Sequence, residues 1–319
     1  NAILIDADLS GANLRNADLS NALLIGTNLA NADLTGADLT DTVIINVILT
    51  GTDTSNVTIK EYDGSSTILV GDDISGKDMS NADLRHAILV DANLNGANLR
   101  NADLSNAILE GAILIDANLS GANPRNADLR NAILQDTNLS DTILTGADLS
   151  NTNLRGSDLF SARFNNAVLV DADLSGANLR NADLRNAILQ DTNLSETILT
   201  GADLSNADLT GADLSGADLT LALLIGTDLS NAVLTETNFY YVDLTNAILP
   251  EVGLTGKNFT YTRFNNVDLS GKDLSLSDFS HTKLDNTNLE NINLSFAKFI
   301  LVDFTKIKNK SLAGANLYG

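Results

Sequence analysis

The side chains best suited to catalysis or metal binding are either scarce or evenly dispersed in this chain. There is no cysteine, and the two histidines, His86 and His281, are 195 residues apart. No histidine stands in a constellation with a serine and an acid, which argues against a hydrolytic triad, and the lack of thiolates excludes zinc sites built from cysteine and histidine. The sequence therefore predicts no catalytic residue, no metal ligand, no cofactor and no enzyme activity.

Carboxylates are the one abundant reactive group. The chain has 41 Asp and Glu against 19 Lys and Arg, a net charge of −22. Residues 1–235 hold 32 acidic and 11 basic residues, and residues 236–319 hold 9 and 8, so the acid lies in the first three quarters. This charge opposes direct binding to nucleic acid or to an anionic membrane. Loose binding of divalent cations is an alternative, but the even spread favours a solvated surface.

A repeat of five residues positions all of these side chains. The pentads 2–6, 7–11 and 12–16 read AILID, ADLSG and ANLRN, with a small first and an apolar third residue. Of 61 pentads, 58 carry Leu, Ile, Phe or Met at the third position, and 25 carry Asp at the second. First and third positions have the same parity, so both can point inward from an extended segment. Asp, Asn, Gly, Ser and Thr at the outer positions favour a turn in every pentad.

The pattern of a small residue, Asp or Asn, Leu or Phe, then Ser, Thr or Arg and a variable fifth residue resembles the pentapeptide repeat family. The resemblance covers nearly the whole chain. It implies an all-β fold, a right-handed quadrilateral β-helix in which four pentads make one coil of twenty residues. At ~4.8 Å per coil, the 61 pentads would form about 15 coils and a rod roughly 70 Å long. Such a rod is stabilised by stacking of neighbouring coils.

We expect one continuous β-helix over residues 1–305. Its least regular stretch is 52–66, where Thr54 and Gly64 occupy third positions, and this stretch is expected to bulge out as a loop. Pro124, also at a third position, lacks a backbone donor and is predicted to be a local defect. The chain begins at Asn1 inside a repeat, which is typical of a processed or excised product.

The C-terminal quarter departs from the repeat consensus. From Phe239 onward six third positions are Phe, and first positions include Lys, Thr and Val, although we expect that site to admit only small residues. The last coils should therefore be less regular. The frame breaks after Phe304, and residues 306–319 are predicted to form a register-shifted end. No run of apolar residues is long enough for a transmembrane helix, so no membrane insertion is expected.

Apolar residues at outward positions are the strongest sign of an interface. Sixteen of the 61 second positions are Ile, Val or Leu, and many recur every twenty residues, flanked by apolar fourth positions. Stacked in rows, they would form a ribbon on the surface, and contiguous apolar patches usually mark interfaces. Neutral drift, or coverage by the 52–66 loop, is the alternative. The predicted interface comprises Ile3, Ile5, Leu23, Ile25, Val43, Ile45, Ile48, Ile68, Val70, Ile88, Val90, Ile108, Ile113 and Ile133.

Two functions follow as hypotheses. The first is a structural or protein-interaction rod that associates with itself, laterally through the ribbon and end to end through open coil edges into a fibre. The second is an acidic DNA mimic that binds a DNA-binding protein such as gyrase, because fluoroquinolone-resistance members of the resembled family are acidic rods that occupy the DNA groove of gyrase. Those members are generally shorter and dimerise through a C-terminal element that this sequence does not show.

Overall fold

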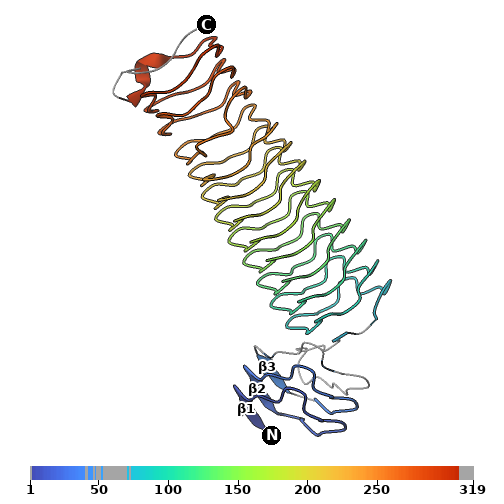
Figure 1. The fold of residues 1–319 in the computed structure, drawn as a ribbon. Coiled ribbons are helices and arrows are strands. Elements are labelled where there is room, and N and C mark those ends of the chain that lie inside the picture. The colour runs from blue at the N-terminus through green and yellow to red at the C-terminus, as the bar shows by residue number, and fades with distance from the viewer. Residues whose placement is uncertain are drawn as a thin grey trace.

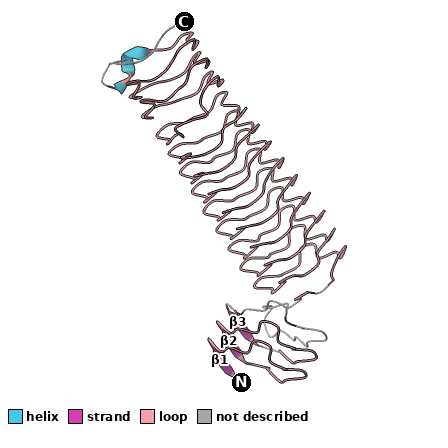
Figure 2. Cartoon of the chain, in the orientation of Figure 1, coloured by secondary structure: helices cyan, strands magenta, loops and turns pink. Residues whose placement is uncertain are grey.

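The protein, here a computed structural model, is a stack of short extended segments joined by turns. The structure describes residues 2–39, 42–45, 47, 52, 70–71 and 73–308. Three short strands, β1 (Ile3–Ile5), β2 (Leu23–Ile25) and β3 (Val43–Ile45), pair in parallel in that order. A 3-10 turn, η1 (Phe304–Lys306), lies near the C-terminal end. The other described residues form turns and isolated bridges, and none lies in an α-helix (Figure 2).

The bridges reveal how many pentads make a coil. Each isolated bridge joins residues twenty apart in parallel, as Asp73 joins Asn93 and Asn118 joins Asn138. Twenty residues are four pentads, so the chain returns to the same place on the stack after every fourth pentad, and the coils follow one another along an elongated body (Figure 1). The predicted β-helix is confirmed. Its handedness, its square cross-section and the number of coils stay predictions.

Three backbone hydrogen bonds per pentad hold neighbouring coils together, and one of them runs from a fifth-position N–H to the fourth-position carbonyl nineteen residues later, as Asn101 donates to Ser120 at 3.0 Å. The N–H of a third-position residue donates to the carbonyl of a second-position residue nineteen residues later, as Leu144 donates to Arg163 at 2.8 Å. The N–H of a second-position residue donates to a first-position carbonyl of the preceding coil, as Asp158 donates to Thr137 at 3.0 Å. Every coil is therefore bonded along its circumference to the coils on either side.

Pro124 interrupts this ladder. It has no N–H to donate, and among the described residues no bridge joins Asn123 to Ile143, although their counterparts before and after are bridged. The side-chain oxygen of Asn123 is also buried without a hydrogen-bond partner. The predicted local defect is confirmed.

The outer polar residues shape the turns. Fifth positions adopt left-handed backbone angles, such as φ +55° at Asn101 and +68° at Gly121, which Asn, Asp and Gly tolerate best. The side chain at a second position accepts the N–H two residues later, as Asn118 Oδ1 accepts the Ser120 N–H at 3.1 Å. This arrangement is an Asx turn. The polar residues of the repeat are therefore needed to form the turns of the backbone, in addition to facing solvent.

First and third positions fill the core, as the repeat predicts. Leu94, Leu99 and Leu104 are fully buried, and so is Phe264 in the Phe-rich coils. Where Thr takes the first position, its hydroxyl reaches a carbonyl of the preceding coil. Thr137 Oγ1, for example, donates to the Leu114 carbonyl at 2.7 Å.

The expectation that only small residues fit the first position is wrong. Lys257 and Lys272 both occupy it and are buried. The Lys257 ammonium donates to the carbonyl of Leu234, twenty-three residues earlier, which is the acceptor that a threonine would use. Lys272 Nζ donates to Glu251 Oε1 at 2.9 Å and to the Pro250 carbonyl at 3.2 Å. A long side chain fits here because its polar end takes over the hydroxyl's hydrogen bond.

Two predicted irregularities lie mostly outside the described residues. Of the stretch 52–66, only Thr52 is described; it is buried, and its hydroxyl donates to the Leu29 carbonyl at 2.7 Å. Of the predicted end 306–319, only 306–308 are described, where η1 ends. The structure shows an irregularity that the repeat frame did not predict, at Pro250–Gly253, where Val252 turns outward and is 78% exposed.

Candidate interaction surfaces

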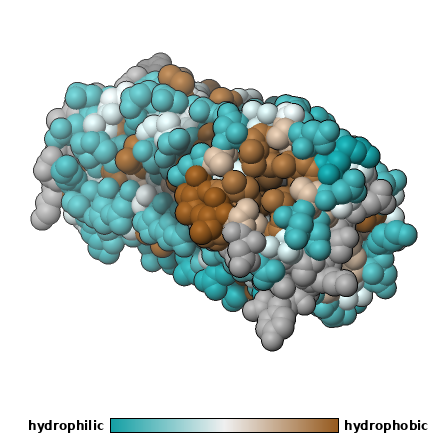
Figure 3. Space-filling view, turned by 90° about the horizontal axis from the view of Figure 1, so that it is seen from below, coloured by the Kyte–Doolittle hydropathy of each residue, from teal (hydrophilic) through white to brown (hydrophobic). Residues whose placement is uncertain are grey.

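The first row of the predicted ribbon stacks as expected. Ile3 pairs with Leu23 and Leu23 with Val43, and Ile5, Ile25 and Ile45 pair in the same register. Ile3 is 71% exposed and Ile5 is 53% exposed, while Leu23 is half-buried. Seen from this end, the molecule presents apolar surface (Figure 3). For Ile25, Val43 and Ile45 the structure describes the strand backbone.

Part of the second row is not at the surface, and here the sequence prediction is wrong. Val70, Ile88 and Val90 are 6%, 1% and 5% exposed. They belong to a buried cluster that also contains Leu19 and Leu39 of the first coils. The chain itself covers these side chains, so they are unavailable to a partner without rearrangement.

The remaining members of the ribbon are only partly accessible. Ile108 pairs with Ile88 and packs against the same cluster, and Ile113 pairs with Ile133. Ile108, Ile113 and Ile133 are half-buried. Ile48 and Ile68 lie outside the described residues. Among the predicted interface residues whose side chains the structure describes, the exposed ones therefore lie on β1.

The acidic surface is held by hydrogen bonds. Asp273 Oδ1 accepts the Ser275 N–H at 2.9 Å and also the side-chain amide of Asn293, one coil later, at 3.0 Å. The side-chain and backbone hydrogen bonds from Ser275 lower the pKa of Asp273 below its ordinary value. These carboxylates are thus ionised and fixed in direction at neutral pH. Among the described residues, no group of three or more His, Asp or Glu side chains converges as a metal site would require.

Arginines pair with neighbouring carboxylates rather than forming a basic stripe. Arg130 donates to Asp128 in the same pentad through Nε at 2.8 Å and Nη2 at 2.6 Å. Arg185 makes the same forked contact with Asp183 at 2.8 and 2.7 Å. Both guanidinium groups are about half exposed. In these pentads the arginines therefore offset the charge of neighbouring aspartates.

A column of aromatic rings in the C-terminal coils is a feature that the sequence reasoning missed. Tyr241 stacks on Tyr261 with ring centres 4.5 Å apart and planes 15° apart, and Tyr261 stacks on His281 at 4.5 Å and 5°. Tyr240 packs edge-on against both tyrosines at 5.3 and 5.9 Å. The signal was present, because Tyr241, Tyr261 and His281 are all fifth-position residues spaced by twenty.

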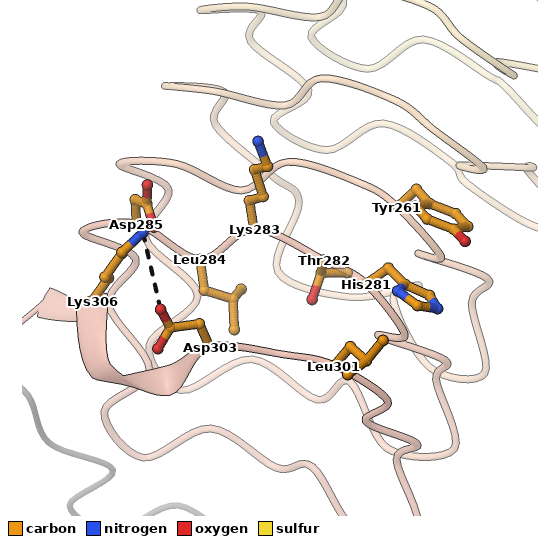
Figure 4. Close-up of a pocket in the computed structure, with 9 residues that line it drawn as sticks. All are labelled: Tyr261, His281, Thr282, Lys283, Leu284, Asp285, Leu301, Asp303 and Lys306. Atoms are coloured by element: carbon orange, nitrogen blue, oxygen red, sulfur yellow. Dashed lines mark ion pairs between the residues drawn. The ribbon is translucent and has the colours of Figure 1, made fainter.

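An open cavity of about 400 Å³ adjoins this column. Tyr261 and His281 lie at one end of it, and Asp285 and Lys306 lie at the other (Figure 4). Lys306 Nζ is 3.9 Å from carboxylate oxygens of Asp285 and Asp303. No hydrogen bond joins His281 to a carboxylate in this described region, so the cavity holds no triad.

Among the helices that the structure describes, none is long and apolar enough to cross a membrane.

Parallel bridges every twenty residues, and an Asx turn in nearly every described pentad whose second residue is Asp or Asn, define a solenoid built from five-residue units. A family model described as pentapeptide repeats matches residues 2–41 and, in overlapping segments, 78–308. The chain belongs to the pentapeptide repeat family.

Several solved structures are similar to it. A trypsin-treated form of QnrB1, a plasmid-mediated fluoroquinolone resistance protein, is 22% identical with a TM-score of 0.42, covering 58% of this chain and 92% of QnrB1. HetL, involved in heterocyst differentiation regulation in the cyanobacterium Nostoc sp. strain PCC 7120, is 28% identical with a TM-score of 0.30, covering 85% of this chain and 90% of HetL. No curated protein matches the chain.

Proposed function

We propose that this protein is a non-enzymatic interaction rod, a right-handed quadrilateral β-helix of about 15 coils, that associates laterally with itself through the apolar row on β1 to β3. The observation that carries the proposal is the exposure of Ile3 and Ile5, in register with Leu23 and the strands beyond. Surrounding coils present carboxylates, which repel a second copy, whereas this row is uncharged.

Burial of such a row favours association because apolar surface gains about 25 cal/mol per Å² when water is removed, before the entropic cost of association is subtracted. The register of β1 with β2 and β3 places Ile3, Leu23 and Val43 opposite one another along the row, so two copies can meet along it. Contact through a row rather than a pocket suits a protein whose surface otherwise repeats from coil to coil.

The test is the oligomeric state of the full chain carrying Ile3→Asp and Ile5→Asp. Light scattering should show a shift toward smaller particles, while the far-UV circular dichroism spectrum stays unchanged because both side chains face solvent. Asn13→Asp, which adds a charge to another exposed position of the same coil, serves as the matched control. Unaltered particle size in the Ile3 and Ile5 variant would refute the role of the row.

End-to-end stacking is a further part of this proposal. Coil edges carry backbone donors and acceptors that can pair with the edge of another rod. Negative-stain microscopy of the purified chain should then show fibres longer than one rod. Single rods and side-by-side pairs alone would limit association to the lateral contact.

The second candidate is an acidic DNA mimic that binds a DNA-binding protein such as gyrase. It is favoured by the net charge of −21 over residues 1–235 and by the regular Asx turns that fix the direction of the carboxylates. A mimic should inhibit gyrase supercoiling at micromolar or lower concentration, and reversal of acidic residues in 1–235 should abolish the inhibition. Full supercoiling activity at high excess of the protein would remove this candidate.

A further inference from the structure

The backbone ladder is interrupted beside the outward turn at Val252. In the repeat, a third-position N–H donates to a second-position carbonyl of the next coil, and the N–H of that same second-position residue donates back to a first-position carbonyl. Neither bond forms between the segments 247–249 and 267–269, all of which the structure describes. The bridge expected between Ile248 and Asp268 is missing too. The two coils are therefore unpaired along this side.

The segments on either side of the interruption keep the geometry of the repeat. Asp228 is bridged to Ile248, and Asp268 is bridged to Asn288. The residue after Leu249 is a proline, which favours an extended backbone at Leu249 because a residue that precedes proline avoids the helical region. Each wall of the interruption is thus an extended segment that is paired on its far side and free on the side that faces the other wall.

An open cavity of about 330 Å³ lies between the two walls. Ala247, Ile248 and Leu249 line it from one coil, and Asp268 and Ser270 line it from the next. Ala247 and Leu249 are only 5% and 3% exposed, yet within this described region the Leu249 N–H and the Ala247 carbonyl have no hydrogen-bond partner. Buried backbone groups without a partner are rare. A ligand with N–H and C=O groups of its own can satisfy them.

The charged groups at the cavity favour a basic ligand. Glu251, Asp268 and Lys272 line it, which gives a net charge of −1. Lys272 is buried and already donates to Glu251 and to the Pro250 carbonyl. The Glu251 side chain is 86% exposed, and Asp268 is exposed as well. The charge of Lys308, two coils further on, also acts on Asp268. A cation can therefore reach both carboxylates, whereas the ammonium at the cavity is occupied.

We propose that this cleft binds an extended peptide segment of a partner protein that carries a basic residue at its centre. Three residues, running parallel to the walls, complete both ladders. The central residue donates its N–H to the Ala247 carbonyl and accepts the Leu249 N–H, which is the place that Asp268 would take in an unbroken stack. The residue before it accepts the Asp268 N–H, and the residue after it donates to the Asp268 carbonyl.

The same geometry specifies the residue types of the segment. The central side chain points outward, as those of Ile248 and Asp268 do, so an arginine or lysine there lies beside the Asp268 carboxylate. The flanking side chains point toward the core, where the repeat carries Ala and Leu. A segment such as Ala-Arg-Leu fits. Ala-Asp-Leu, which recurs throughout this chain, instead places a third carboxylate beside Glu251 and Asp268. The cleft thus selects against pentads of its own kind.

Binding requires the two coils to separate to about twice the ~4.8 Å strand spacing along this side. No backbone hydrogen bond between the walls is lost, because none is present. The Asn266 amide must release Asn246, which it contacts at 3.0 Å, and the ion pair of Lys272 with Glu251 must stretch or exchange. These losses offset part of the gain, so the affinity for a short peptide is modest.

The test titrates labelled nine-residue peptides into the full chain and follows fluorescence anisotropy. One probe carries Ala-Arg-Leu at its centre, and the matched probe carries Ala-Asp-Leu. The first should bind with a dissociation constant below about 1 mM and at least ~10-fold more tightly than the second. Asp268→Asn should weaken it by roughly 2–5-fold. Asp228→Asn is the matched control, since Asp228 makes the same Asx turn in the same column beside an intact ladder. It should leave the affinity unchanged.

Hydrogen exchange then locates the bound peptide. With the Ala-Arg-Leu probe present, amide exchange should slow in the segments that contain Leu249 and Asp268, and should stay unchanged around Leu209, where the ladder is complete. Ile3→Asp with Ile5→Asp should not alter peptide binding, which separates this inference from self-association through the row on β1 to β3. Equal affinity for the two probes, equal effects of the Asp268 and Asp228 variants, or binding without protection at Leu249 and Asp268 would overturn the proposal, as would the absence of binding at about 1 mM.

Discussion

The hydroxyl of Thr137 donates a hydrogen bond to the carbonyl of Leu114, twenty-three residues earlier, at 2.7 Å in the buried core. Ser157 makes the same contact with Leu134 at 2.6 Å, and the Lys257 ammonium makes it with Leu234. A first-position donor thus ties each of these coils to the one before it, in addition to the backbone ladder.

Thr137→Val should lower the free energy of unfolding by about 1 kcal/mol, because valine keeps the shape but removes the donor to the Leu114 carbonyl. Urea unfolding followed by circular dichroism measures the change. Thr137→Ser is the control, since Ser157 shows that serine can reach the equivalent carbonyl. Equal losses for valine and serine would mean that packing, rather than the hydrogen bond, carries the effect.

Leu154→Ala should lower the free energy of unfolding by about 2–5 kcal/mol, because Leu154 is fully buried at the centre of its coil and alanine leaves a cavity. The neighbouring Arg155→Ala, at an exposed fourth position, should change it by less than about 0.5 kcal/mol. Comparable losses for the two substitutions would contradict the division into inner and outer positions.

Pro124→Leu should stabilise the rod by about 1 kcal/mol. Leucine restores the N–H that can donate to the Ile143 carbonyl. It also frees the backbone, so that the Arg125 N–H can donate to the buried Asn123 side-chain oxygen. The two hydrogen bonds contribute more than the ~0.4–1 kcal/mol that is lost because leucine gives the unfolded chain more conformational freedom. Chemical denaturation measures the change. Pro124→Ala separates the effect of the hydrogen bond from that of packing, because alanine restores the N–H donor without filling the core. No gain with leucine would show that the coil has already adapted to proline.

The five-residue period made the inner and outer positions and the twenty-residue register predictable, because each depends on local parity and turn chemistry. Ile3, Leu23 and Val43 align as the spacing predicted. The burial of Ile88 was not predictable, since it results from contact with the cluster around Leu19, which is remote in sequence. A period describes how a chain stacks on its neighbouring coil, and it carries no information on contacts made outside that stack.

Exceptions inside the frame were harder to interpret. Lys257 at a first position looked like disorder in the repeat, yet its ammonium reaches the acceptor normally used by threonine. Val252 keeps the expected spacing but turns outward two residues after Pro250. For Lys257 the result depends on a hydrogen bond between coils, which is visible only when the coils are placed on one another.

Acid should destabilise the folded rod through its Asx turns. The hydrogen bonds from the hydroxyl and backbone N–H two residues later lower the pKa of Asp73, Asp273 and Asp303 in the folded state. A depressed folded-state pKa adds stability that is fully present above the unfolded value, about 3.9, and is lost as pH falls below it. The melting temperature should therefore change little between about pH 7 and 5 and fall below about pH 4.

The triple variant Asp73→Asn, Asp273→Asn and Asp303→Asn isolates this contribution. Asparagine can accept the same N–H, as Asn293 accepts that of Ser295 at 3.1 Å, but it does not titrate. The variant should keep its fold at pH 7 and lose less of its melting temperature than the parent on acidification, as measured by thermal scans at several pH values. Parallel curves for variant and parent would show that acid acts elsewhere, for example by removing the repulsion among the remaining carboxylates.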